Sequence, residues 1–175
     1  MKKIYILTAF LFFTGVIVFS QTQYEVSVDP NNGEKTLKGI INRSIIENDT
    51  SFKWYEENRK IYAPNETAAT ALRNNKDSVE LIVFMGTWCE DSHFVIPRFF
   101  SLIDKAGFPN EKITLLGADR DKKTLSHLAE ALNVKNVPTI IVMKNGKEMG
   151  RVIEYGRTGQ FDKELGDIVN GIAVN

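Results

Sequence analysis

The sequence predicts an α/β domain, with a mixed central sheet and helices on both faces, that follows a mostly helical N-terminal extension. Two continuous apolar runs, at 81–85 and 113–118, are typical of strands that are buried on both faces. Each run is followed by a segment whose apolar residues recur at helical spacing. Asn145 and Gly146 then indicate a tight hairpin, because both residues tolerate the left-handed backbone of such a turn. The resulting order β-α-β-α-β-β-α predicts the mixed sheet.

The predicted domain occupies residues 79–175. Gly107 closes its first helix, as glycine commonly does at helix C-termini. The predicted elements are, in order, a strand at 81–85, a helix at 93–106, a strand at 113–118, a helix at 122–132, strands at 140–143 and 148–153, and a helix at 161–172.

Residues 21–78 form the predicted extension, which we expect to cover one edge of the sheet. Alternating apolar residues from Tyr24 to Val28 indicate an edge strand. Further on, apolar residues recur at helical spacing, and N-cap residue types precede the second such segment. The predicted elements of the extension are the strand at 24–28 and helices at 37–46, 52–62 and 66–74.

Residues 1–20 have the pattern of a cleaved secretory signal. Lys2 and Lys3 precede an uncharged apolar run, and Val18 and Ser20 are small residues at the spacing that a signal peptidase reads. The alternative is an uncleaved membrane anchor, although the run is short for a membrane span. We therefore expect an exported protein, periplasmic or secreted, that meets the membrane only through this segment.

Composition limits the classes of function. The chain is 43% hydrophobic and 25% charged, which is ordinary for a globular protein and argues against disorder over its whole length. Its 22 basic and 22 acidic residues balance, and no segment concentrates the basic ones, so nucleic acid is not an expected partner. Cys89 is the only cysteine, so the chain forms no internal disulfide.

Several short motifs occur in a characteristic order between residues 79 and 174, a little over half of the chain. They are a buried strand that runs into Trp88-Cys89, a proline (Pro97) in the following helix, the sequence Val137-Pro138-Thr139, the turn Lys144-Asn145-Gly146, and Gly156 after the last strand. In this order and spacing the region resembles the thioredoxin superfamily. The resemblance implies a cis-proline loop at Val137-Pro138 and a kink in the helix at Pro97.

Two departures from the family pattern concern the reaction itself. The motif here is W-C-E-D-S, so Ser92 stands where dithiol members carry a resolving cysteine. Val83 stands where those members carry a buried acid that helps to move a proton. The W-C-x-D-S pattern is similar to that of exported bacterial members that also have an N-terminal extension. The resemblance therefore implies the fold but not the dithiol reaction of those members.

Cys89 is the candidate catalytic residue, with Ser92 beside it in the motif. At a helix N-terminus the positive end of the dipole favours thiolate over thiol. His93 lies one turn further along and, as a cation, would tune the thiol in the same direction, whereas Glu90 and Asp91 oppose it.

The candidate substrate-binding residues are Trp88, Val137 and Pro138. Trp88 would flank the thiol as a contact surface, or else pack as a core aromatic. The loop at Val137-Pro138 would leave backbone groups free to pair with an extended substrate strand.

With no second cysteine, a mixed disulfide at Cys89 must wait for an outside thiol. This monothiol behaviour suits isomerisation or thiol capture, with cysteine-containing exported proteins or small thiols as partners. The alternatives are an inactive thioredoxin-fold module that binds a peptide or partner, a Cys89-linked homodimer, and a buried, inert Cys89. One cysteine and two histidines make a poor zinc set, so no metal and no cofactor are expected.

Overall fold

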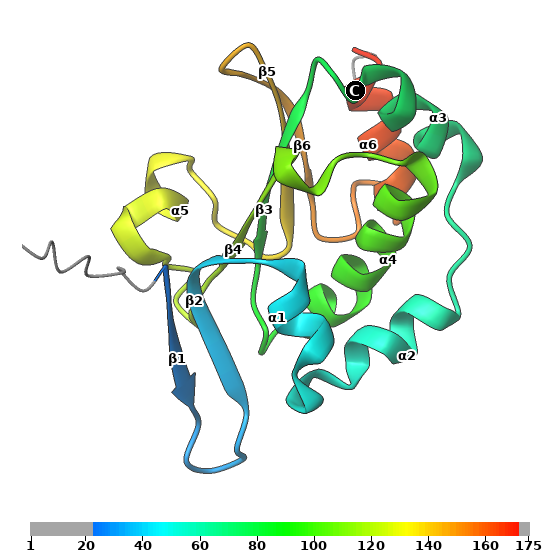
Figure 1. Cartoon of the computed structure of the whole chain (residues 1–175). Helices are drawn as coiled ribbons and strands as arrows, with labels where there is room; N and C mark the ends of the chain where they lie inside the picture. The colour runs from blue at the N-terminus through cyan, green and yellow to red at the C-terminus, as the bar shows by residue number, and fades with distance from the viewer. Residues whose placement is uncertain (1–22, 172–175) are drawn as a thin grey trace, which may run out of the picture.

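The computed structural model describes residues 23–171, so the predicted signal segment at 1–20 lies outside the described residues. A six-stranded mixed sheet with the order β1-β2-β4-β3-β5-β6 forms the centre of the molecule (Figure 1). In chain order the elements are β1 (Tyr24–Val28), β2 (Lys35–Ile41), α1 (Arg43–Asn48), η1 (Thr50–Phe52), α2 (Trp54–Lys60), α3 (Glu66–Asn75), β3 (Glu80–Met85), α4 (Glu90–Ala106), η2 (Asn110–Lys112), β4 (Ile113–Gly117), η3 (Leu125–His127), α5 (Leu128–Ala131), β5 (Thr139–Lys144), β6 (Lys147–Ile153) and α6 (Phe161–Val169).

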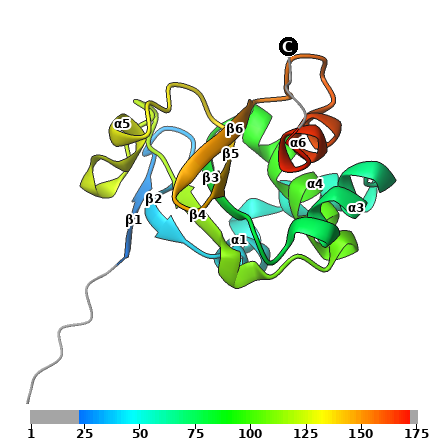
Figure 2. The ribbon, with the colours of Figure 1, turned by 90° about the horizontal axis from the view of Figure 1, so that it is seen from above.

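Helices cover both faces of the sheet. Viewed from above, α5 lies on one side, and α3, α4 and α6 lie on the other (Figure 2). The central strand β3 shows why its sequence is continuously apolar: Val83 and Met85 belong to the core under α4, whereas Phe84 belongs to the core under α5. The predicted α/β class with a mixed, doubly covered sheet is confirmed.

Parallel and antiparallel pairing together make the sheet mixed. β3 runs parallel to β4 and antiparallel to β5, and β5 turns back into β6. Asn145 and Gly146 form that turn with φ of 52° and 73°, as the hairpin prediction requires. Among residues 23–171 no helix is long and apolar enough to cross a bilayer.

The helix predicted at 37–46 is wrong. Residues up to Ile41 form β2, and only the following segment is helical, as α1. Leu37 and Ile41 are buried at two-residue multiples, which fits a strand as well as the helical spacing does. β2 pairs with β1 on one side and with β4 on the other, and these tertiary contacts decide the outcome.

The close approach of β2 to β4 depends on glycine. A Cβ on Gly117 would lie 2.3 Å from the carbonyl oxygen of Leu37, a distance that no side chain tolerates. The predicted edge strand at 24–28 is β1, which completes the sheet beside β2.

The helix predicted at 122–132 is reduced to η3 and the four-residue α5. The Asp119 carboxylate accepts the backbone N–H groups of Asp121 and Lys123, which stabilises a loop at the expected helix start. Ser126 and His127 have left-handed φ of 58° and 55°, which interrupts the helix.

Apolar side chains join the extension to the rest of the protein in one core. Tyr55 and Leu72 are 1% and 0% exposed and lie in the same cluster as Val83 and Phe99. Other buried extension residues in this cluster are Leu37, Ile41, Ile46, Phe52, Ala68, Ala69 and Ala71.

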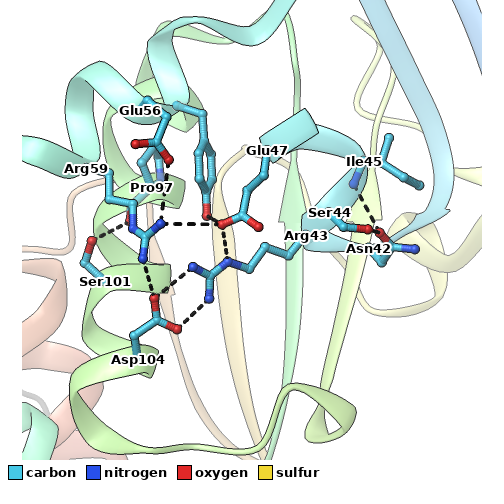
Figure 3. Close-up of polar contacts among 11 residues, drawn as sticks. Asn42, Arg43, Ser44, Ile45, Glu47, Glu56, Arg59, Pro97, Ser101 and Asp104 are labelled. Carbon is cyan, nitrogen blue, oxygen red and sulfur yellow. Dashed lines mark hydrogen bonds and ion pairs between the residues drawn. The ribbon is translucent and has the colours of Figure 1, made fainter. Parts of the chain in front are cut away.

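An ion-pair network adds to this contact between the extension and α4 (Figure 3). The guanidinium of Arg43 forms two hydrogen bonds with the Asp104 carboxylate, at 2.5 and 2.8 Å, and a third with Glu47 at 2.6 Å. Arg59 reaches the same Asp104 at 2.8 Å. Asp104 of α4 is therefore shared by two arginines of the extension.

Candidate functional site

Cys89 occupies the N-cap position of α4, at the end of a tight turn that begins at Gly86. Its N–H donates to the Gly86 carbonyl at 3.0 Å, and its own carbonyl accepts the first helical hydrogen bond, from His93 N–H, at 3.0 Å. The side chain is partly exposed and makes no capping hydrogen bond to the helix. The sulfur thus lies at the open, positive end of a seventeen-residue helix.

Val137 brings the second predicted part of the site to Cys89. The Val137–Pro138 peptide bond is cis. The thiol of Cys89 donates to the carbonyl oxygen of Val137 at 3.2 Å. Because both a thiolate and a carbonyl oxygen are acceptors, this contact exists only while the sulfur is protonated.

Ser92 is fully buried, and its hydroxyl already has a partner. Its exposed fraction is 0%, and its Oγ accepts the backbone N–H of Gly86 at 3.1 Å. The residue therefore holds the beginning of the turn that carries Cys89 from within the protein. A hydroxyl in this place cannot form a disulfide with Cys89.

Trp88 packs next to Cys89 on the core beneath α5. Its indole N–H donates to the carbonyl oxygen of Ala118 at 2.9 Å, which fixes the ring. The cationic groups of Arg120 and Lys122 lie 5.4 and 5.6 Å from the ring centroid. The partly exposed ring thus has a fixed orientation and basic neighbours.

The imidazole of His93 contacts Thr87 in the turn and Trp54 in the extension. Its Nε2 lies 2.7 Å from the carbonyl oxygen of Thr87, and its ring stacks on Trp54 with a centroid distance of 4.3 Å. No hydrogen bond in the described part of the chain joins the imidazole to the Cys89 sulfur. The proposed effect of His93 on the thiol stays a prediction.

Tyr155 and Asp91 form a further pair near Cys89 that sequence reasoning missed. The Tyr155 hydroxyl donates to the Asp91 carboxylate at 2.7 Å. Burial, followed by the hydrogen bond and charge of Asp91 and by the charge of Cys89, raises the pKa of Tyr155 to about 12. The two residues are 64 positions apart, so no local sequence pattern could have linked them.

Acidic and histidine side chains at the start of α4 and after β4 have partners within the protein. Asp91 accepts from Tyr155, His93 contacts Thr87, and Asp119 pairs with Lys38 at 2.7 Å. Within residues 23–171, no group of three or more His, Cys, Asp or Glu side chains is arranged to hold a metal ion. Val83, at the place of the family's buried acid, is an apolar core residue with 0% exposure.

Comparison with known proteins gives matches to thioredoxins. The family model described as Thioredoxin matches residues 62–166. A thioredoxin of Echinococcus granulosus is 31% identical over 83 residues, which is 47% of this chain and 72% of that protein. Thioredoxin H2-2 of Oryza sativa is 29% identical over 47% of this chain, and thioredoxin H9 of Arabidopsis thaliana is 26% identical over 51%. The match spans 58% and 59% of these last two proteins.

Similar solved structures include thioredoxin O2 of Arabidopsis thaliana in the oxidised state, at 24% identity and a TM-score of 0.34, covering 50% of this chain and 71% of that one. An HIV epitope scaffold has a TM-score of 0.47 at 14% identity, covering 74% of this chain and 85% of that one. Because the family model covers more than half of the residues of the chain, the chain belongs to the thioredoxin family.

Proposed function

We propose that this protein is an exported monothiol factor for thiol–disulfide exchange, which acts through Cys89 on cysteine-containing proteins or small thiols. Membership of the thioredoxin family supports thiol–disulfide redox chemistry in general. The observation that carries the monothiol proposal is the turn itself. A partly exposed Cys89 sits at the N-cap of α4, and a buried Ser92 takes the second position. The pattern of residues 1–20 supports export.

The proposed reaction begins with attack of the Cys89 thiolate on one sulfur of a disulfide. The bond between Cys89 and that sulfur forms while the original S–S bond breaks, and the second sulfur leaves as a thiolate that takes a proton from water. Ser92 has no thiol with which to release the adduct. An outside thiolate must therefore attack the mixed disulfide, which returns Cys89 as a thiolate.

Val137 supplies a link between substrate binding and the thiol. An extended peptide that pairs with this loop would direct a backbone N–H to the Val137 carbonyl oxygen. That N–H would replace the S–H of Cys89, whose sulfur lies 3.2 Å from the same carbonyl oxygen in this structure. Peptide binding would thus free the sulfur for attack.

Adduct lifetime tests the proposal. We expect reduced protein incubated with oxidised glutathione to accumulate a Cys89–glutathione disulfide, detected by mass spectrometry. Ser92→Cys restores a second thiol, so its adduct should decay to an internal disulfide without added thiol. Ser101→Cys is the matched control, because it adds a thiol on the same helix away from the turn.

Two results would contradict the proposal. One is a wild-type adduct that is released as fast as that of Ser92→Cys. The other is a Cys89→Ser protein that retains all biological activity, which would favour a binding module without sulfur chemistry. A disulfide-linked dimer in place of the adduct would favour the homodimer alternative.

A further inference from the structure

The turn that carries Cys89 is held from the side of the N-terminal extension. Thr87, two residues before Cys89, is 2% exposed. Its hydroxyl donates to the carbonyl oxygen of Lys35 at 2.8 Å and accepts the N–H of Leu37 at 3.1 Å. Both partners belong to β2, so the backbone of the extension is bonded directly to the active-site turn.

His93 makes a second connection to the same residue. A carbonyl oxygen only accepts hydrogen bonds, so the Nε2 atom of His93 carries the hydrogen in its 2.7 Å contact with the Thr87 oxygen. This bond joins the first turn of α4 to the loop before Cys89. It requires the imidazole to keep one orientation.

Trp54 of the extension holds that orientation. Its ring stacks on the imidazole of His93 at 4.3 Å with an interplanar angle of 15°. Trp54 is the first residue of α2 and packs against the main core. The ring centroids of Phe52 and Tyr55, both buried, lie 5.7 and 6.2 Å from that of Trp54, so aromatic neighbours in the extension help to fix its position.

We propose that Trp54 is a positioning residue for the thiol site: by holding the His93 imidazole on the Thr87 carbonyl, it lets the N-terminal extension set the geometry of the turn that presents Cys89. The inference rests on the proposed function, since it concerns the same sulfur. The helix N-terminus favours the thiolate only while the turn keeps the sulfur at this end of α4. Loss of the stack loosens this arrangement and slows the sulfur's reaction.

Alkylation of Cys89 by iodoacetamide, followed by mass spectrometry on the full chain lacking residues 1–20, is the test. We expect Trp54→Ala to lower the rate by roughly two- to tenfold, the equivalent of one aromatic pair. Trp54→Phe keeps an aromatic stack and should stay within about twofold of wild type. Ile61→Ala is the matched control in the extension, because the Ile61 side chain is 77% exposed, whereas Trp54 packs against the core.

A spectroscopic measurement separates positioning from general destabilisation. In wild type the His93 Nε2–H should give an imidazole resonance in NMR that is protected from exchange with water. Trp54→Ala should lose that protection, and Trp54→Phe should keep it. A Trp54→Ala protein that alkylates at the wild-type rate, or one that slows while His93 stays protected, would overturn the inference.

If Trp54→Ala does not fold, as judged by circular dichroism, two substitutions of His93 decide. His93→Ala should slow alkylation, and His93→Gln, whose amide can donate to Thr87, should restore the rate. Equal rates for the two variants would overturn the inference. Glutathione adduct formation on the same samples tests the proposed function separately, because alkylation requires no disulfide exchange.

Discussion

Tyr155 lies close enough to Cys89 for a charge on the sulfur to affect its phenol. Burial is the largest cause that raises the pKa of Tyr155 to about 12, and the hydrogen bond to Asp91 and negative charge at Cys89 act in the same direction. Removing the charge therefore lowers the pKa of Tyr155. We expect Cys89→Ser to shift part of the tyrosine titration, followed by ultraviolet absorbance, to lower pH.

The control for this titration is Tyr155→Phe. In that background Cys89→Ser should leave the remaining tyrosine titration unchanged. A tyrosine titration that is the same in wild type and Cys89→Ser would show that the two side chains are not electrostatically coupled.

At the residue scale, the sequence predicts the centre of the site better than its surroundings. Cys89 at a helix start and the loop at Val137 could be predicted because short motifs specify both. The stack of Trp54 on His93 could not, because it joins segments whose separation in space no local pattern specifies. The same holds for Tyr155 and Asp91.

At the element scale, the strongly apolar strands and the long helix α4 could be predicted from the sequence. The type of the less apolar segments could not. Leu37 and Ile41 fit a helical and a strand period equally, and only the neighbours β1 and β4 decide between them. The prediction of a long helix in the α5 region was wrong for another reason. Left-handed residues such as Ser126 interrupt a segment whose apolar spacing alone indicates a longer helix.

The ion-pair network between the extension and α4 depends on the carboxylate of Asp104. Partial burial raises the pKa of Asp104, but the hydrogen bonds and charges of Arg43 and Arg59 outweigh burial and leave it below its usual value. We expect Asp104→Asn to lower the free energy of unfolding by about 1 kcal/mol, the upper range for a partly exposed ion pair. Urea unfolding near neutral pH measures this change.

The pH dependence of the same variant follows from the sign of the shift. The contribution of Asp104 is complete above the pKa of an unfolded aspartate, about 3.9, and is lost as the pH falls through its lower folded pKa. Wild type should therefore lose more stability than Asp104→Asn on acidification through this range. Asp167→Asn, which removes only the i,i+4 pair with Lys163 on α6, is the control and should cost about 0.3 kcal/mol. Equal losses for the two variants would contradict a special role for Asp104.

At the scale of the whole molecule, the extension and the thioredoxin region share the hydrophobic core beneath α4. Tyr55 and Leu72 of the extension are buried in the same cluster as Phe99 of α4 and Leu165 of α6. The family model itself begins at residue 62, inside the extension. A core that crosses the sequence boundary favours unfolding in a single cooperative step.

The two tryptophans of the chain, Trp54 and Trp88, allow this cooperativity to be measured. Trp88→Phe leaves Trp54 as the fluorophore in the extension, and Trp54→Phe leaves Trp88 beside Cys89. In each variant we expect the fluorescence transition in urea to coincide with the transition seen by far-ultraviolet circular dichroism, because neither part retains a complete core without the other. A Trp54 signal that changes at lower urea than the circular dichroism would show that the extension unfolds first. The thiol site would then lose its contacts to β2 and α2 before the other strands of the sheet unfold.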